Sequence, residues 1–492
     1  MEGGMMKRAI LSALIFCAAA ATASERGDYL VQMANNQSQI KLMALLPAGT
    51  QVESLGLNNW YRVQLPKQEL ATFRAQALMQ NRAVNHVENN QIIRPLESVS
   101  LKNARTQFQA LKKLGAAPNM GISKAGDDNL PIPANGSGGS GEDPLFSKQW
   151  GMAQANVKSA WEKGTGNPEM IVAVIDTGVD YTHEDLVDNM WRNSGETGRD
   201  GQGRDKTTNG VDDDGNGYID DVVGWDFADN DGKPYDKYAS FTDILNGKNP
   251  GHGTHCAGNV GARGDNGKGI AGVAPNIRIM GLRFITYEGS GTTADAIKAI
   301  KYAADNGAKV LSNSWGSEGE DEGSGEGQAL RDAIKYAQEK DVLFIAAAGN
   351  GHQGRGYNND TDDRPAYPAS YDNENIISVA AINVGGTLGS FSNWGLRTVD
   401  LGAPGVKVFS TVPGNRYQDS LGSFLGQELN WDGTSMATPH VAGAVALYWS
   451  AHPDKNWQEV KNALLSSVKK TNALSSKVSS GGQLDVLSLM NQ

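Results

Sequence analysis

The 492-residue sequence predicts an α/β protein in which a mainly parallel β-sheet lies between layers of helices. From Asp143 onward, short runs of continuous apolar residues alternate with stretches that have helical spacing. Continuous apolarity indicates strands that are buried on both faces, as in a parallel sheet covered by helices. Ligands of such sheets bind beyond the carboxyl ends of the strands, so the residues after each apolar run are candidates for chemistry.

Residues 1–23 have the pattern of a secretory signal peptide. Lys7 and Arg8 precede an apolar run of about a dozen residues, and the small residues Ala21-Thr-Ala23 follow at the usual cleavage positions. The run is too short to span a bilayer as a helix. We therefore expect a secreted protein, extracellular or, in a double-membrane bacterium, periplasmic, with no membrane contact once the signal is removed.

Residues 25–96 predict a small α+β domain, and residues 97–141 a flexible linker. Alternating apolar residues indicate strands and a 3.6-residue spacing indicates a helix. The predicted strands are 29–33, 60–65 and 84–93, and the predicted helix is 68–80. The linker prediction rests on the composition from Gly115 to Glu142, which is rich in Gly, Ser, Pro, Asn and Asp.

The remaining residues, 142–492, predict the main domain. The expected strands are 171–175, 279–282, 309–312 and 342–348, and the expected helices are 292–306, 328–340 and an apolar one from Gly433 to about Trp449. The strands are short continuous apolar runs, whereas the helices are longer and separate them. This alternation supports the parallel sheet.

Composition and charge exclude several classes of protein. With 39% hydrophobic and 20% charged residues the chain is too apolar for general disorder. Residues 1–141 carry a net charge of +5 and the remainder −16, and so acidic a main part argues against nucleic acid as a partner. Signal removal takes Cys17 away and leaves Cys256 alone, which excludes an intramolecular disulfide.

Four motifs accompany the predicted strands and helices. They are Asp176-Thr-Gly-Val-Asp, His252-Gly-Thr-His-Cys-Ala-Gly, Gly349-Asn350-Gly351 and Gly433-Thr-Ser435-Met-Ala. Each alone has an ordinary explanation, since an Asp or Ser beside a helix is usually a cap. Together and in this order they resemble the subtilisin-like serine endopeptidases, the subtilase family, over residues 143–492, with the thermitase-like branch as the nearest group.

The resemblance implies a subtilisin-like three-layer αβα fold and an Asp176, His252 and Ser435 triad in the family's chain order. A serine hydroxyl becomes a good nucleophile when a base takes its proton, and His252 is the available imidazole. Asp176 is expected to fix the imidazole tautomer. Asn350 matches the family's side-chain donor to the oxyanion, and Ser435 is expected at a helix N-terminus whose N–H groups face that oxyanion.

The same resemblance implies that substrate binds as an added β-strand between two walls. The wall residues are Gly289, Ser290 and Gly291 on one side and Ser314, Trp315 and Gly316 on the other, and the pocket for the residue before the scissile bond is bordered by Ala348, Gly349 and Ala366. Small residues there predict a roomy, mainly apolar pocket and broad specificity. Tyr367-Pro368 lies where the family keeps a cis proline.

A loop rich in carboxylates predicts a Ca²⁺ site. Its residues fit the early positions of an EF-hand loop, although position 12 is Val223 and no flanking helices are evident. The expected ligands are Asp212, Asp214, Asn216, Tyr218 through its carbonyl, Asp220 and Asp221. The alternative is a solvated Asp/Gly turn.

A second Ca²⁺ site is implied by the resemblance alone. Its side-chain ligands would be Asp143, Asp185 and Asn266, and its carbonyl ligands Arg263, Lys268 and Ile270. Bound calcium would stabilise a folded chain that has no disulfides.

The N-terminal domain resembles the family's inhibitory propeptide, which suggests a zymogen whose own propeptide is its intramolecular inhibitor. A permanently attached accessory domain is the alternative. We expect a monomer that acts on protein and peptide substrates. The alternative of another class is a catalytically silent peptide-binding scaffold. A nucleotide-binding protein, suggested by the letters of Gly267-Lys-Gly-Ile-Ala-Gly272, is rejected because the motif precedes a strand, the reverse of the required position.

The acidic stretch 318–326 directly follows the wall at Ser314-Trp-Gly316. It is either a solvated loop or a feature that favours basic residues in the substrate by electrostatic attraction.

Overall fold

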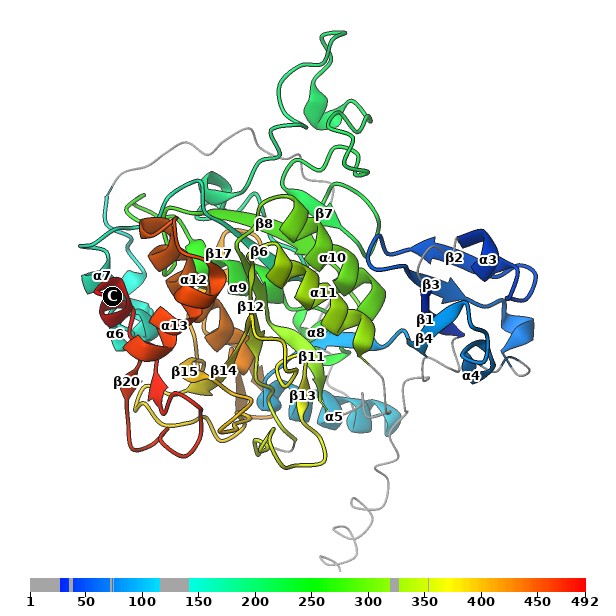
Figure 1. The fold of residues 1–492 in the computed structure, drawn as a ribbon. Helices are drawn as coiled ribbons and strands as arrows, with labels where there is room; N and C mark the ends of the chain where they lie inside the picture. The colour runs from blue at the N-terminus through cyan, green and yellow to red at the C-terminus, as the bar shows by residue number, and fades with distance from the viewer. Residues whose placement is uncertain are drawn as a thin grey trace, which may run out of the picture. The chain divides into compact units, whose positions relative to one another are not determined.

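The computed structural model describes residues 27–34, 39–70, 73, 75–115, 141–318, 327–352 and 354–492. The predicted signal peptide, residues 116–140 of the predicted linker and residues 319–326 of the acidic stretch lie outside this part. The chain divides into two compact units, one containing the described residues up to Leu55 and Asn59–Gln91, the other Gly56–Asn58 and Ile92–Gln492 (Figure 1). No helix of the described part is long and apolar enough to cross a membrane.

The first unit is built around a four-stranded antiparallel sheet in the order β2-β3-β1-β4. Its elements are β1 (Asp28–Met33), α3 (Gln39–Met43), β2 (Gln51–Ser54), β3 (Trp60–Gln64), the 3₁₀ turn η1 (Lys67–Glu69), α4 (Ala75–Leu78) and β4 (Val84–Asn89). Alternate residues of β1, Tyr29, Val31 and Met33, share a small core with Val63 of β3, as the alternation predicts.

The predicted helix 68–80 is wrong in extent. Among the described residues of this range, which leave out 71, 72 and 74, the chain forms only η1 and the single turn α4. Leu70 and Phe73, which carried the helical spacing, pack against the small core from outside the two turns. So short a segment gains little from propensity and takes the conformation that buries its apolar residues.

The second unit contains a nine-stranded sheet that confirms the predicted mainly parallel architecture. The order is β20-β21-β15-β14-β12-β10-β6-β8-β7, and only β20 runs antiparallel to its neighbour. The strands are β6 (Ile171–Asp176), β7 (Gly224–Asp226), β8 (Arg278–Arg283), β10 (Val310–Asn313), β12 (Leu343–Ala347), β14 (Ile376–Ile382), β15 (Leu401–Pro404), β20 (Lys469–Lys470) and β21 (Gly482–Gln483).

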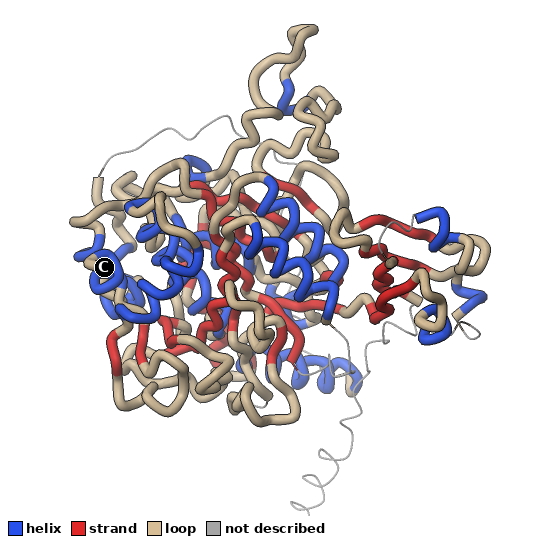
Figure 2. Tube along the Cα trace, in the orientation of Figure 1, coloured by secondary structure: helices blue, strands red, loops and turns tan. Residues whose placement is uncertain are grey.

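Helices cover both faces of this sheet (Figures 1 and 2). α9 (His252–Gly261) and α12 (Thr434–Ala451) pack together on one face, and α10 (Thr293–Asp305) and α11 (Gln328–Glu339) pack together on the other. α12 is almost wholly buried, which explains its uninterrupted apolar sequence. Shorter or more peripheral helices in the described part of this unit include α6 (Trp150–Gln154), α7 (Val157–Ala160), α8 (Phe241–Leu245), α13 (Trp457–Ser467) and α14 (Val486–Met490), with 3₁₀ turns η2 (Phe146–Lys148), η3 (Val187–Asn189) and η4 (Lys206–Thr208).

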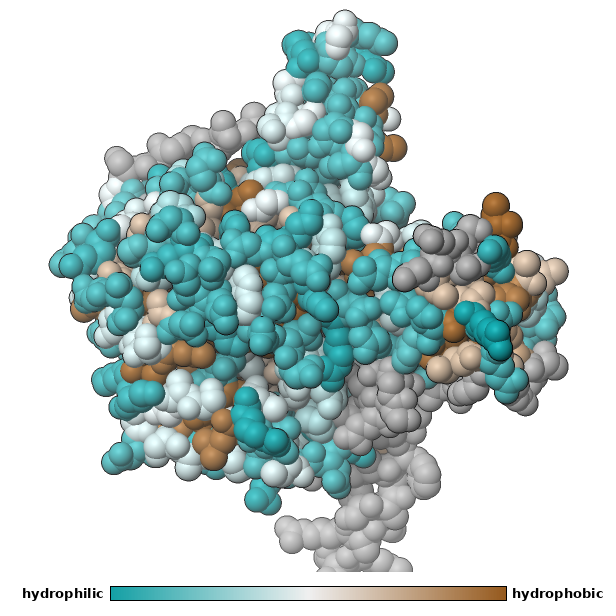
Figure 3. Space-filling model, in the orientation of Figure 1, coloured by the Kyte–Doolittle hydropathy of each residue, from teal (hydrophilic) through white to brown (hydrophobic). Residues whose placement is uncertain are grey.

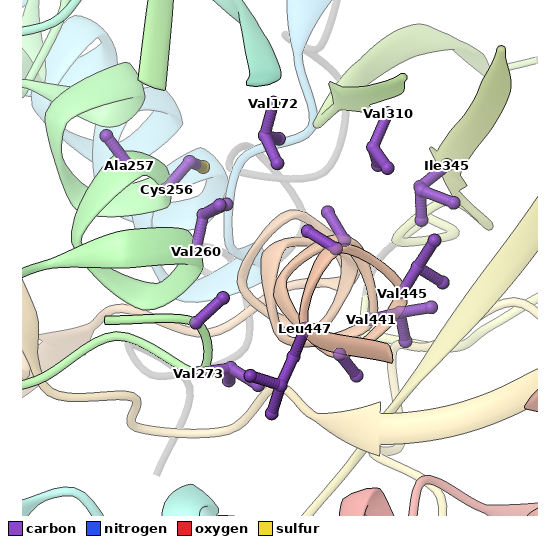
Figure 4. Packing of buried hydrophobic residues seen from close by; sticks show 14 of the residues in the cluster. Val172, Cys256, Ala257, Val260, Val273, Val310, Ile345, Val441, Val445 and Leu447 are labelled. Atoms are coloured by element: carbon purple, nitrogen blue, oxygen red, sulfur yellow. The ribbon is translucent and has the colours of Figure 1, made fainter. Parts of the chain in front are cut away.

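The main core lies around α12. Figure 4 shows Val441 and Val445 of this helix beside Ile345 of the sheet, with Val310 close by and Val260 of α9 on the other flank. This packing holds the N-termini of α9 and α12 beside the carboxyl ends of the strands, where the site residues were predicted. The outer surface in view in Figure 3 is mainly hydrophilic.

Three smaller sheets complete the second unit. A four-stranded sheet has the order β13-β11-β5-β9, and two hairpins are β16-β17 and β18-β19. Their strands are β5 (Ile92–Pro95), β9 (Gly291–Thr292), β11 (Trp315–Glu318), β13 (Ala366–Tyr367), β16 (Ser410–Val412), β17 (Arg416–Gln418), β18 (Ser420–Phe424) and β19 (Gln427–Asn430). The single strand predicted at 84–93 is thus two strands, β4 and β5, which belong to different sheets. The Tyr367-Pro368 peptide is cis, as expected.

Part of the predicted linker is a helix, so the linker prediction is wrong over these residues. α5 (Val99–Lys113) begins after Ser98, whose hydroxyl accepts the N–H of Leu101 over 3.2 Å as an N-cap. The Gly- and Ser-rich composition starts only at Gly115. Residues 99–113 contain neither Gly nor Pro and have apolar residues at helical spacing, so they follow the ordinary pattern of an amphipathic helix.

Candidate active site

The three residues of the predicted triad lie together at one edge of the main sheet. Asp176 is the last residue of β6, His252 the first of α9 and Ser435 the second of α12. All three side chains are buried. Because α9 and α12 pack side by side over β6, their N-termini meet at the carboxyl end of that strand.

Asp176 and His252 form a buried ion pair. His252 Nδ1 lies 2.8 Å from Asp176 Oδ1, which also accepts the N–H of Thr177 over 2.7 Å. Burial alone lowers the pKa of His252, but the charge and hydrogen bond of Asp176 outweigh this effect and hold the pKa well above its ordinary value of 6.5. Burial raises the pKa of the nearby Cys256 thiol, so Asp176 is the charge that stabilises the imidazolium.

The Ser435 hydroxyl lies beside two backbone carbonyls. Its Oγ is 2.9 Å from the carbonyl oxygen of Ser314 and 3.0 Å from that of Leu96. His252 Nε2, the atom that would take the serine proton, is buried and makes no hydrogen bond within the described residues. The nucleophile therefore rests against the chain segment in the cleft and is not bonded to its base.

Asn350 directs its amide toward the same Leu96 carbonyl. It follows β12, and its Nδ2 donates to the carbonyl oxygens of Leu96 over 2.8 Å and Glu97 over 3.0 Å. Its Oδ1 accepts from both the N–H and the hydroxyl of Thr434, each over 2.9 Å. Thr434 thereby fixes which way the amide points, so the donor is held in place before any charge develops.

A segment of the chain occupies the cleft as an added strand. β5 lies between β9 and β11 and pairs antiparallel with both, with Ile93 opposite Gly291 and Arg94 opposite Gly316. The N–H of Leu96 then donates to the Ser314 carbonyl over 3.3 Å. Residues 92–96, which we call the tail, thus bind as a peptide substrate would, with the Leu96 carbonyl between Ser435 and Asn350.

The predicted wall residues lie on both sides of the tail. Gly291 belongs to β9, and Gly289 and Ser290 form the turn that leads into it. Ser314 and Gly316 contact the tail through their backbone. The Trp315 ring points into the core against Phe284 and Phe344, so this residue lines the cleft with main chain only.

The predicted pocket residues also lie together. Gly349 has a φ of +106°, and a Cβ placed on it would come within 2.7 Å of the Ala366 Cβ and 2.4 Å of Asn393 Nδ2. Ala366 is the first residue of β13, beside β11. Ala348 is fully buried and its carbonyl accepts from Asn359 Nδ2 over 2.8 Å. Only glycine fits position 349.

A buried carboxylate that the sequence analysis missed supports the loop before α9. Asp236 accepts four hydrogen bonds of 2.6–2.8 Å, from Thr177, Asn249 and, twice, Thr254. Thr177 in turn accepts the N–H of Gly253, the residue after His252, over 2.8 Å. Asp236 thereby holds the residues next to Asp176 and His252. No local pattern marked it, since its partners come from three separate segments.

The residues of the calcium site implied by resemblance lie together. Asn266 Nδ2 donates to Asp185 Oδ1 over 2.9 Å, and the Asn266 N–H donates to Asp143 Oδ1 over 3.2 Å. Burial, with the charges of Asp185 and Asp265, raises the pKa of Asp143 to about 6. The carbonyl candidates Arg263, Lys268 and Ile270 lie on the same turn, where the N–H groups of Arg263 and Ile270 bond to Asp185.

The acidic loop brings together part of its predicted ligand set. Asp212 and Asp214 lie within ligand-sharing distance of Glu196, a residue that the sequence analysis missed. Glu196 is buried and its Oε2 has no hydrogen-bond partner within the described residues. Asn216 and Asp221 are joined by a hydrogen bond of 2.9 Å, and burial with the charge of Asp214 raises the pKa of Asp221 to about 6.

Two members of the predicted set do not converge in the same way. Asp220 turns to the N–H of Gly210, at 3.1–3.2 Å, because it takes a left-handed backbone conformation with φ +55°. The Tyr218 ring packs against Trp225 and Tyr302. Gly217, at the position where an EF-hand loop requires a sharp turn, has φ +95°.

Comparisons with known proteins agree with this geometry. The profile of the Subtilase family matches residues 167–481. A thermophilic serine proteinase of Bacillus sp. (strain AK1) is 36% identical over 322 residues, which are 65% of this chain and 62% of that protein. Thermitase of Thermoactinomyces vulgaris is 35% identical over 306 residues, which are 62% of this chain and 84% of thermitase. The match thus spans less than two thirds of the first of these relatives.

A solved structure shares the fold. The crystal structure of fervidolysin from Fervidobacterium pennivorans, described as a keratinolytic enzyme related to subtilisin, superposes with a TM-score of 0.64 at 24% identity. The superposition covers 95% of this chain and 61% of fervidolysin. At this identity the likeness shows the subtilisin-like fold alone.

Proposed function

The chain belongs to the subtilase family, and from this membership and its site geometry we propose that it is a serine endopeptidase that hydrolyses peptide bonds of proteins. One observation carries the proposal: a peptide carbonyl, that of Leu96, lies against both Ser435 Oγ and Asn350 Nδ2, with the Asp176–His252 pair behind. Nucleophile, oxyanion donor, base and orienting acid are therefore arranged around one scissile position.

In the proposed reaction Ser435 Oγ attacks the carbonyl carbon and His252 Nε2 takes its proton. Asp176 stabilises the imidazolium, while Asn350 Nδ2 donates to the oxyanion that forms on the carbonyl oxygen. His252 then gives the proton to the departing amine, which breaks the C–N bond and leaves an acyl-enzyme. A water, deprotonated by His252, hydrolyses the acyl-enzyme and restores the serine.

Substrate is proposed to bind as the tail does, by β-augmentation between β9 and β11. Main-chain pairing recognises any extended peptide, and the small residues Gly349 and Ala366 leave room for an apolar side chain, which supports broad specificity. The preference for basic residues suggested by the acidic stretch 318–326 stays a hypothesis, since only Glu318 of it is described.

The chain is proposed to be made as a zymogen whose N-terminal domain ends in its own inhibitor. The tail fills the cleft and its Leu96 carbonyl occupies the reactive position. These contacts support the Leu96–Glu97 peptide bond as the first bond that the enzyme cuts. Secretion, directed by residues 1–23, and a monomeric state belong to the same proposal.

Calcium is proposed to stabilise the folded enzyme. Oxygen ligands from clustered carboxylates suit Ca²⁺. One ion would be held by Asp143, Asp185 and Asn266 with neighbouring carbonyls, and another by the acidic loop. The orphaned Glu196 Oε2 beside Asp212 and Asp214 fits a cation there, and it makes Glu196 a better ligand candidate than Asp220. Bound calcium would supply charge neutralisation and takes no part in the reaction.

The proposal is tested by expressing the full chain beside Ser435→Ala. We expect the wild type to yield a new amino terminus at Glu97 and to degrade casein, while Ser435→Ala stays uncut and inactive. The alternative, a silent peptide-binding scaffold, predicts that both chains stay intact. A wild type that folds but neither processes itself nor degrades casein would overturn the proposed function.

A further inference from the structure

Helix α5 begins directly after the Leu96–Glu97 bond, on the side of the leaving half. Its buried residues Leu101, Ala104 and Phe108, with Leu111 partly buried, recur every three or four positions and form one apolar face. This is the pattern of a helix that docks in an apolar groove.

The face packs on a surface built from two elements of the catalytic unit, which we call the platform. The platform consists of α8, the segment before it and the hairpin β18-β19, and its apolar side chains are Ala239, Phe241, Ile244, Leu245, Leu421, Phe424 and Leu429. Phe108 meets Phe424 edge to face, with ring centroids 5.9 Å apart. Phe424 and Leu429 are buried by this contact region.

Polar contacts fix the helix in register on the platform. Arg105 donates to the carbonyl oxygens of Ile244 over 2.6 Å and Lys248 over 3.0 Å, at and just beyond the C-terminal end of α8, where a positive charge is favourable. The same guanidinium pairs with the Glu97 carboxylate. Arg105 therefore ties the docked helix to the residue that follows the scissile carbonyl.

The docked segment also covers the catalytic base. Ser98 and Leu101 line one small cavity together with His252, Trp431 and Met436. His252 Nε2 is buried beneath it. The water that hydrolyses an acyl-enzyme must approach this nitrogen, so the segment lies where deacylation requires open space.

We propose that the platform binds an amphipathic helix that begins two residues after the scissile bond, and that its occupant is the chain's own segment 97–115, retained after the first cut. This inference rests on the proposed function. Cutting Leu96–Glu97 releases the tail side, but Glu97 stays covalently attached to the catalytic unit through the following chain. The tether gives the helix a high effective concentration at the platform.

Retention makes the segment a second inhibitor. When the C–N bond breaks, His252 returns a proton to the Glu97 nitrogen and Ser435 keeps the Leu96 acyl group. An amine held in place can attack the same ester carbon and re-form the peptide bond, with the proton passing back through His252 to Ser435. Hydrolysis of the acyl-enzyme is slowed by this reversal, but it fixes each cut and lets the Glu97 terminus accumulate. The entry of new protein substrate waits until the helix leaves the platform.

The test follows maturation of the full chain by amino-terminal mass spectrometry and by casein hydrolysis. In the wild type, the Glu97 terminus is expected well before casein-degrading activity. In Leu101→Asp/Phe108→Asp the delay between the two should be about tenfold shorter, because removing the central apolar anchors of an interface costs at least that factor in affinity.

The matched control is Asn103→Asp/Gln107→Asp, which adds the same two charges on the exposed face of the same helix and should keep the wild-type delay. Arg105→Ala, which leaves the apolar face intact, should shorten the delay in part and guards against misfolding of the double variant. The proposal is overturned if wild-type activity rises together with the Glu97 terminus, or if the apolar double variant keeps the delay of its control. A chain that never cuts itself overturns the proposed function instead.

Discussion

The catalytic role proposed for Asn350 depends on how its neighbours hold the side chain. Thr434 holds its Oδ1 through two hydrogen bonds, which leaves Nδ2 aimed at the reactive carbonyl. An amide fixed in this way stabilises the oxyanion without reorganisation. The motif identifies the residue, but only the contact with Thr434 explains why the amide faces the cleft.

Asn350→Ala should lower kcat about 10²–10³-fold, the loss known for the corresponding donor of subtilisin, a member of the same family. KM should change little, because the hydrogen bond strengthens only as the oxyanion forms. Steady-state kinetics on a peptide with leucine before the scissile bond measures both. A parallel rise in KM with unchanged kcat would assign Asn350 to ground-state binding. Asn358→Ala, outside the cleft, serves as the control.

In the proposed reaction, His252 sets the pH dependence. It must be neutral to accept the serine proton, and Asp176 holds its pKa well above 6.5. Activity should therefore fall as the pH falls through that pKa, with the acid limb of kcat/KM centred above pH 6.5. The pH profile of the processed enzyme checks this. An acid limb centred below pH 6 would contradict the ion-pair account.

Among the elements, the continuously apolar strands and the helices that cover the main sheet were predicted well, whereas the segments 68–80 and 99–113 were not. β6, β10, α10 and α11 lie within one or two residues of their predicted bounds, because continuous burial or a full helical face leaves a strong periodic signal. The helix predicted at 68–80 is wrong in extent. Leu70 and Phe73, which gave the helical spacing, pack against the small core of the first unit from outside the two helical turns. α5 was missed because the linker prediction, which rested on the composition from Gly115 onward, was extended back over residues 99–113.

We expect the stability of the acidic loop to depend on its carboxylates more than on helices or strands. Its charges cluster where burial already raises the pKa of Asp221 to about 6 and raises that of Glu196. A cation would relieve both effects. Excess chelator should therefore lower the melting temperature, measured on Ser435→Ala so that autolysis does not interfere. An unchanged melting temperature in excess chelator would contradict the calcium proposal.

Glu196 and Asp220 provide a matched pair for this loop. Glu196→Gln should reduce the stabilisation that added calcium gives, because it removes a charge that converges with Asp212 and Asp214. Asp220→Asn should leave it nearly unchanged, since that carboxylate faces the Gly210 N–H instead. Calcium titrations followed by thermal melting compare them. Equal losses from the two variants would restore Asp220 to the ligand set.

For the whole molecule, the important feature is that one chain supplies enzyme, substrate-like strand and docked helix. The tail side chains differ in exposure: Leu96 is 3% exposed, whereas Arg94 faces solvent. Leu96→Asp should therefore slow the first cut strongly by placing a charge in a buried apolar position, while Arg94→Asp should leave its rate near that of the wild type. The amount of the Glu97 terminus over time measures the difference, and equal rates would contradict the assigned bond.

The four motifs were enough to identify the family and to nominate the triad residues, and the alternation of apolar runs with helical stretches predicted the sheet between helix layers. Acyl transfer requires particular residue types, and strand ends and helix starts are visible in local patterns. Which residues of the chain occupy the cleft, 92–96, and that 99–113 form a helix docked beside it came only from the tertiary structure. Leu96 and Asn350 are 254 residues apart in the chain, and no periodicity records which backbone carbonyl an amide will meet. Glu196 and Asp236 were hidden for the same reason: a buried carboxylate is defined by partners that folding brings from separate segments.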